Sequence, residues 1–259
     1  AGDHFITVQR PLGIDPRPQL LASIMSKKMA AGATDLVMDI PMGSETKVGT
    51  IDLAKSYSRD LMDLGDRLGI RTECLITYAE QPLGEAVGPA LEARECMQVL
   101  ERLPGHDDVA DKACLCAGTI LEMAGIANGQ SEARRILESG EARAKFLEIA
   151  AAQGGTPDIS SVDVAPGMFS RDVVSKSSGF VRKISNKGLV AVAKAAGAPR
   201  DKGAGLILRK KTGSKVSCGE TMMTVYADCE DKLEHAVLVA GESEPISVAG
   251  MVIGRVSPE

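Results

Sequence analysis

The chain has 259 residues, of which 44% are hydrophobic and 25% charged, and its formal net charge is −5. This length favours about two domains and permits a substantial core. The negative charge argues against a nucleic-acid surface, which usually carries a basic footprint. Because no apolar run approaches the ~18 residues of a membrane-spanning helix and no signal peptide precedes the first strand, we expect a soluble cytoplasmic protein with no membrane partner.

The cysteines and histidines show no metal-binding pattern. No two cysteines have the C-x2-C spacing that tetrahedral zinc sites favour, and the three histidines lie far apart in the sequence. We therefore predict buried free thiols, no metal and no Ser-His-Asp or Cys-His arrangement. The six cysteines are Cys74, Cys96, Cys114, Cys116, Cys218 and Cys229.

The first predicted elements are a short strand and a helix. Residues 4–10, HFITVQR, are predicted to form a short strand. Asp15 has the position of a helix N-cap, and Pro16 that of the first helical residue, where a missing N–H costs nothing. The helix is expected to run to about Ala31 and to end at Gly32.

A polar face and a polar loop follow from this part of the sequence. Ser23 and Lys27 share one side of the helix by their i, i+4 spacing, whereas apolar residues cover most of the rest and predict a mostly buried helix. The apolar run 34–40 is typical of a parallel strand covered on both faces. The loop 41–47, which contains Lys47, follows the carboxyl end of that strand, where ligands bind in open α/β sheets.

The elements then alternate between helix and strand. An amphipathic helix is predicted for 51–68 and a strand for 70–79, an order that favours right-handed βα units in a parallel sheet. Further helical segments are expected at 84–103, 107–124 and 131–153, with stops at Gly125, Gly129 and Gly140.

A change of composition indicates a domain boundary. The segment 154–160 has two glycines and a proline and is the clearest predicted linker. Beyond it, short strands mix with helices at 187–197 and 230–240. We therefore expect an α/β domain of parallel-sheet βα units and helices over 1–159, followed by a smaller α+β domain over 160–259.

Several separated motifs resemble the thymidine and pyrimidine-nucleoside phosphorylase family. Residues 23–48, SIMSKKMAAGATDLVMDIPMGSETKV, match its Ser-Ile-x-x-Lys-Lys-x-Ala-x-Gly helix and Gly-Ser loop, and residues 81–95, QPLGEAVGPALEARE, are similar to a second signature. DIPMG, ITYAEQPLG and GAPRDKGAGLIL resemble an archaeal, AMP-cleaving branch more than the bacterial thymidine enzymes. The resemblance covers essentially the whole chain.

The resemblance implies a pentosyl transfer in nucleotide degradation: AMP and phosphate give adenine and ribose 1,5-bisphosphate. Phosphate is a co-substrate, no cofactor is implied, and the protein is expected to be a homo-oligomer. Asp15, eight residues before Ser23, matches the acid that protonates the leaving base. Ser23 and Lys47 match nucleotide-binding positions, and Lys27 matches a lysine that contacts the base.

One departure from the family pattern limits these expectations. The family places Gly-rich phosphate-binding loops upstream of the serine helix, and this chain starts after them. The resemblance therefore implies a C-terminal portion that holds half of an active site and is inactive alone.

The residues by themselves permit plainer interpretations. An aspartate before proline is an ordinary helix cap, and capping lowers a carboxylate's pKa, whereas a general acid needs the opposite shift. Ser23 could donate to a backbone carbonyl one turn earlier. Lys27 and Lys47 could be surface charges; Lys27 and Lys28 point about 100° apart, so at most one faces a cleft.

Two alternative functions stay open. The first is a pyrimidine-nucleoside (thymidine) phosphorylase. The second is not enzymatic: the hairpins near the C-terminus resemble biotinyl and lipoyl carrier domains, which suggests a carrier-like or oligomerisation module. No carrier motif with a modifiable lysine is present.

Overall fold

The computed structural model describes residues 16–250. The predicted strand 4–10 and Asp15 lie outside these residues. Contacts divide the described chain into two compact units, the first comprising 16–78 and 116–130 and the second 79–115 and 131–250.

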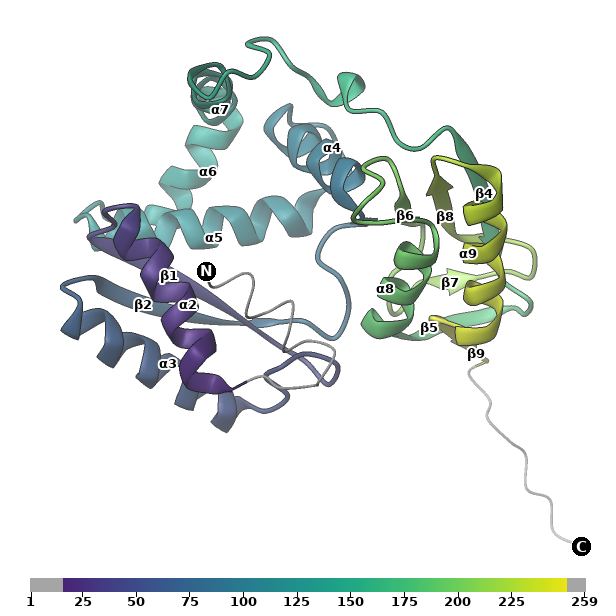
Figure 1. Cartoon of the computed structure of the whole chain (residues 1–259), viewed down its shortest axis with the longest axis horizontal. Coiled ribbons are helices and arrows are strands. Elements are labelled where there is room, and N and C mark those ends of the chain that lie inside the picture. Colours follow the sequence, from purple (N-terminus) through teal and green to yellow (C-terminus); the bar gives the residue numbers. More distant parts are fainter. Residues whose placement is uncertain (1–15, 251–259) are drawn as a thin grey trace, which may run out of the picture. The chain divides into compact units, whose positions relative to one another are not determined.

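The first unit contains a helix, a strand, a second helix and a second strand (Figure 1). They are α2 (Arg17–Ala30), β1 (Asp35–Met42), α3 (Ile51–Arg67) and β2 (Arg71–Tyr78). The unit also contains the last part of α5 (Asp107–Met123), which begins in the second unit.

Parallel pairing of β1 with β2 forms the sheet of this unit. The register runs from Asp35 opposite Arg71 to Met42 opposite Tyr78. Arg71 Nε donates to Asp35 Oδ1 at 2.6 Å at the start of the pair. This bond, with one from Thr34, holds the pKa of Asp35 below its usual range. Within residues 16–250 this parallel sheet has two strands, so the predicted series of βα units stays a prediction.

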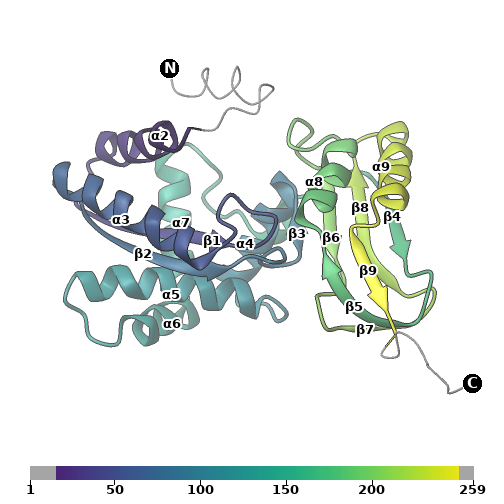
Figure 2. The ribbon, with the colours of Figure 1, turned by 90° about the horizontal axis from the view of Figure 1, so that it is seen from below.

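The core of the first unit lies on one face of the sheet. Leu36 and Ile40 of β1 pack with buried residues of α2 and α3 (Figure 2). The neighbouring Val37 and Asp39 are only half-buried. The prediction that β1 is covered on both faces stays a prediction.

The helix α2 is also less buried than its composition suggests. Only Leu21 and Met25 are buried, whereas Met29 in its last turn is 54% exposed. Apolar residues occur on several sides of this helix, but α3 packs against a single stripe of them.

The second unit has two antiparallel sheets and most of the helices. Its helices are α4 (Pro89–Leu100), the start of α5, α6 (Gly129–Ser139), α7 (Glu141–Ala152), the short 3-10 helix η2 (Ser161–Asp163), α8 (Asn186–Ala195) and α9 (Glu230–Ser243). Its strands are β3 (Ala86–Val87), β4 (Phe169–Val174), β5 (Gly179–Ile184), β6 (Gly205–Leu208), β7 (Lys215–Val216), β8 (Thr221–Ala227) and β9 (Ile246–Ala249).

One predicted helical segment begins as a strand, and the predicted stop at Gly140 divides another. The segment 84–103 begins with β3, and Gly88, with φ of +132°, ends that strand before Pro89 starts α4. The segment 131–153 is divided by Gly140, whose φ of +86° a continuous helix cannot contain.

One core joins both sheets of the second unit. The strand orders are β3-β6-β8-β4 and β7-β5-β9. The helices α8 and α9 supply the remaining core side chains, and Val192, Leu206 and Val225 are fully buried (Figure 2). Because β3 pairs with β6, a short segment before residue 100 completes a sheet made by residues after 165. The predicted division of the chain near 160 stays a prediction.

Among residues 16–250, no helix is both long and apolar enough to span a membrane.

We predict that Gly65→Ala lowers the free energy of unfolding by about 1–3 kcal/mol, measured by chemical denaturation. A methyl group on Gly65 would lie 2.7 Å from the Ile70 carbonyl oxygen and closer still to Thr72 Oγ1. Gly241→Ala is the matched control: it is also helical but has open space around it, so it should be neutral or stabilising by up to about 1 kcal/mol. Equal destabilisation by both substitutions would contradict the packing described for α3.

Candidate substrate site

The start of α2 and the carboxyl end of β1 lie at the same end of the first unit. The chain reverses between them at residues 31–34, so the helix runs back along the strand (Figures 1 and 2). The loop 43–48 follows β1 at this end. Polar groups of the helix start and of the loop therefore lie at the same end of the first unit.

Arg17 fixes the start of α2 on α3. Its Nη2 donates to Ser56 Oγ at 2.9 Å and pairs with Asp60 Oδ2 at 2.5 Å. The guanidinium also lies 4.2 Å from the ring centroid of Tyr57, a cation–π distance. The sequence alone did not predict a role for Arg17, although Arg17 follows directly after Asp15 and Pro16.

Thr46 organises the loop after β1. Its hydroxyl accepts hydrogen bonds from the N–H groups of Gly43, at 3.2 Å, and Val48, at 3.1 Å. The same hydroxyl lies 2.9 Å from the carbonyl oxygens of both residues. Gly43 N also donates to Val48 O at 3.2 Å, and Val48 forms a parallel bridge with Met42. The loop is therefore a closed turn whose geometry a side-chain hydroxyl sets, a feature that sequence reasoning missed.

The predicted site residues occupy different parts of this unit. Asp15 lies outside the described residues, and the N-cap position predicted for it is held by Pro16 because α2 begins one residue later, at Arg17. Ser23 is half-buried on α2, about 9 Å along the helix from Arg17. Lys27 is exposed in the last turn, about 15 Å along, which places it further from the loop. Lys47 is exposed in the loop itself.

Ser26, and not Ser23, donates a side-chain hydrogen bond to a backbone carbonyl in this part of α2. Ser26 Oγ donates to the Ser23 carbonyl at 3.3 Å, and among the bonds of the described residues none runs from the Ser23 hydroxyl back along the helix.

A carboxylate on the sheet adds to the polar groups near this edge. Thr77 Oγ1 of β2 donates to Asp39 Oδ1 of β1 at 2.6 Å. Asp39 precedes the loop by only three residues, and the pair ties the two strands together close to their carboxyl ends.

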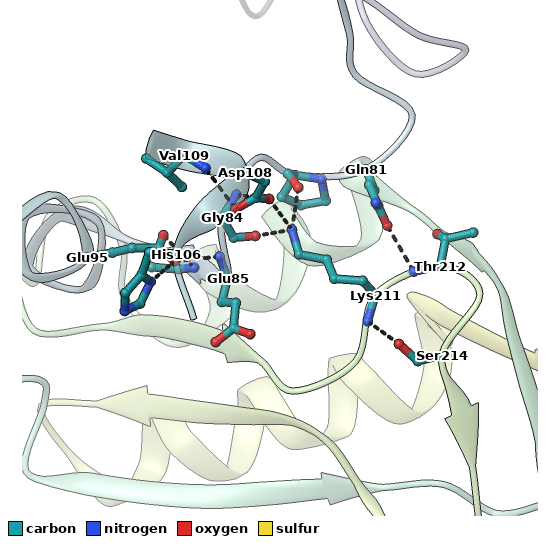
Figure 3. Close-up of polar contacts among 12 residues, drawn as sticks. Gln81, Gly84, Glu85, Glu95, His106, Asp108, Val109, Lys211, Thr212 and Ser214 are labelled. Atoms are coloured by element: carbon teal, nitrogen blue, oxygen red, sulfur yellow. Dashed lines mark hydrogen bonds and ion pairs between the residues drawn. The ribbon is translucent and has the colours of Figure 1, made fainter. Parts of the chain in front are cut away.

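The next loop along the chain follows β2 and belongs to the second unit. Residues 79–88 are held by Glu95, Asp108 and Lys211, which come from α4, α5 and the segment after β6 (Figure 3). Glu95 is 7% exposed and also lies 3.2 Å from His106 Nδ1.

Within residues 16–250, no three His, Cys, Asp or Glu side chains are grouped so as to hold a metal ion. None of the six cysteines, all within residues 16–250, forms a disulfide. Burial raises the pKa of the Cys74 and Cys114 thiols, but Cys96, Cys218 and Cys229 are exposed. The prediction of buried thiols is therefore wrong for these three.

Comparison with known proteins agrees with the motifs of this site. The chain is 45% identical to the AMP phosphorylase of Methanosarcina barkeri over 259 residues, 99% of this chain and 51% of that protein. It is 46% identical to AMP phosphorylase 1 of Archaeoglobus fulgidus over 254 residues, 98% of this chain and 50% of that protein. With the AMP phosphorylase of Thermococcus kodakarensis it shares 44% identity over 259 residues, 99% and 52% of the two chains.

A family model also matches part of the second unit. Residues 180–247 match the pyrimidine nucleoside phosphorylase C-terminal domain. The match to this domain and the similarity to the relatives above cover different extents of the chain, the first residues 180–247 and the second almost all of it. The chain is similar to the archaeal AMP phosphorylases, and it spans about half the length of the curated relatives it matches.

We predict that Thr46→Val opens the loop after β1. The substitution keeps the side-chain shape but leaves the Gly43 and Val48 amides without their hydroxyl acceptor, which costs about 1–2 kcal/mol of local stability. Hydrogen exchange of residues 43–48 should accelerate about tenfold. Thr46→Ser, which retains the hydroxyl, is the control and should exchange as the unaltered protein does. Equal protection in Thr46→Val would show that the hydroxyl does not organise this loop.

Proposed function

We propose that the protein to which this chain belongs catalyses phosphorolysis of AMP, giving adenine and ribose 1,5-bisphosphate. The observation that carries the proposal is the identity of 44–46% between almost the whole chain and three proteins named AMP phosphorylase. The loop after β1 supports it, because an ordered turn with an exposed lysine stands where α/β proteins bind ligands.

The reaction needs two groups on opposite sides of the sugar. A bound phosphate attacks the anomeric carbon, and an acid or hydrogen-bond donor neutralises the departing base. We assign Asp15 as the acid, Ser23 and Lys47 as nucleotide contacts, and Lys27 as a further base contact. The anchoring of α2 by Arg17 supports this assignment, since a fixed helix start lets neighbouring groups be aimed at one ligand.

The rest of the active site belongs, in this proposal, to the part of the protein that matches the other half of the relatives' length. That part supplies the phosphate-binding loops and further strands that extend β1 and β2 into a sheet of βα units. A two-stranded sheet is marginal alone, which supports such an extension. The isolated chain is then inactive, and the C-terminal α+β domain, 160–259, serves the homo-oligomer.

A pyrimidine-nucleoside phosphorylase is the second candidate, since residues 180–247 match the C-terminal domain of that family. Full-length protein given AMP or thymidine with phosphate distinguishes the two: we expect adenine release from AMP to exceed thymine release at least a hundredfold. The reverse order would overturn the nucleotide assignment. A carrier role would instead show as a covalent adduct in the intact mass.

We predict that Asp15→Asn lowers kcat for AMP about 10²- to 10⁴-fold in the full-length protein, the range that general acid catalysis contributes. Asp52→Asn is the control, because Asp52 is an exposed aspartate in the first turn of α3 and has no assigned role. Near-normal turnover by Asp15→Asn, or an equal loss in Asp52→Asn, would remove Asp15 from the mechanism.

We also predict that Lys47→Gln raises KM for AMP about 10- to 100-fold, because a bond between a charged group and the nucleotide is worth about 1.5–3 kcal/mol. The exposed Lys28 of α2 provides the control variant, Lys28→Gln, which should change KM less than twofold. An unchanged KM in Lys47→Gln would exclude Lys47 from nucleotide binding.

A further inference from the structure

The helix α7 of the second unit buries none of its 12 residues within the described structure. Phe146 and Ile149, two large apolar residues of this helix, are 40% and 50% exposed. The preceding helix α6 differs, because Ala133 and Leu137 on one side of it are buried. Gly140 separates the two helices, which run in different directions (Figure 1). The packing that buries one side of α6 therefore does not extend to α7.

The residues of α7 divide into a charged face and an apolar face. Successive residues of a helix are about 100° apart, which places Glu141, Lys145 and Glu148 on one side. Lys145 forms an ion pair with Glu148 there. The opposite side, the apolar face of α7, consists of Ala142, Phe146, Leu147, Ile149 and Ala150, with Arg143 among them.

An apolar face of this kind needs a surface to pack against. A helix of only 12 residues is marginal in water by itself. Most helices in proteins are stabilised by burial of an apolar stripe rather than by the propensity of their residues. We therefore expect the complete protein to cover the apolar face of α7.

Arg143 gives a second and independent indication of a missing partner. It lies one turn before Phe146 and Leu147 on the same side of the helix. Its Nε is buried and has no hydrogen-bond partner among the described residues. A buried donor without an acceptor costs free energy, so the surface that covers this face should offer an oxygen atom to Arg143.

The size of the apolar face favours a contact within one molecule over a contact between two copies. A helix of 12 residues is about 18 Å long and about 10 Å wide. A stable interface between separate chains buries about 800 Å² on each partner, which is several times what one side of such a helix presents. Two parts of one chain can dock through a smaller area, because they are already joined and lose little further freedom on contact.

The relatives contain a further part of suitable size. The chain spans 51% of the AMP phosphorylase of Methanosarcina barkeri and 50% of AMP phosphorylase 1 of Archaeoglobus fulgidus. We propose that the apolar face of α7 docks on the other half of the same protein molecule, against an apolar surface that supplies an oxygen acceptor to Arg143. This docking concerns the assembly of the protein and does not rest on the proposed reaction.

A photochemical cross-link in the full-length protein tests which surface covers α7. Benzoylphenylalanine, a photoreactive analogue of phenylalanine, takes the place of Phe146. Peptide mapping should join position 146 to residues outside this 259-residue sequence. A mixture of isotope-labelled and unlabelled protein shows whether the link lies within one molecule, as we expect. The same analogue in place of Lys145, on the charged face, is the control and should give at least tenfold less of this product.

Thermal unfolding of the full-length protein provides a second readout. Phe146→Ala should lower Tm by at least about 3 °C, because a covered side chain is lost. If the helix were exposed, the same change would be neutral or would raise Tm, since alanine is the better helix former. Arg143→Met should also lower Tm, because it leaves the acceptor unpaired. Lys145→Ala is the control and should stay within about 1 °C, since an exposed ion pair contributes little.

The outcomes separate this docking from the other possible occupants and from the proposed function. A link from position 146 to a second copy, or only to residues of this chain, would overturn the proposal. An unchanged Tm in Phe146→Ala or in Arg143→Met would overturn it as well. A protein that gives the expected link and Tm shifts but does not cleave AMP would confirm the docking and contradict the proposed function alone.

Discussion

Parallel pairing of β1 with β2 is the constraint on which the candidate site depends. The pairing brings the carboxyl ends of both strands to one edge, with Met42 opposite Tyr78. The reversal between α2 and β1 returns the helix start to the same end of the unit (Figure 2). The start of α2 and the loop after β1 thus lie at one end of the first unit, and the Asp35–Arg71 ion pair supports the register at the opposite end.

In each unit by itself, side chains fix backbone segments where regular structure ends. Arg17 ties the start of α2 to α3, and the Thr46 hydroxyl closes the loop after β1. In the second unit, Glu95 and Lys211 take opposite polar groups of one loop, the amides and the carbonyls. In each case polar bonds fix a backbone segment that would otherwise sample many conformations.

Local patterns predicted the helices and strands of residues 17–78 closely, because periodicity and glycine stops determine where each begins and ends. These patterns failed where a partner distant in the sequence determines the local structure. The pairing of Ala86 with Ile207 made a strand at the start of a predicted helix. The bonds from Lys211 to Pro82 and Gly84 join residues more than 120 positions apart in the sequence, which no local pattern predicts. Roles for Ser23, Lys27 and Lys47 came from family resemblance, since a serine or lysine pattern alone fits a surface equally well.

The most direct test of the proposed active site is a crystal structure of the full-length protein with bound AMP, in which sulfate replaces phosphate. We expect the nucleotide to lie within hydrogen-bond distance of Ser23 and Lys47, with its base beside Asp15, and the sulfate to be bound by residues from outside this chain. A nucleotide bound without any contact to residues 15–47, or a sulfate held wholly by residues of this chain, would contradict the division of the active site proposed for this protein.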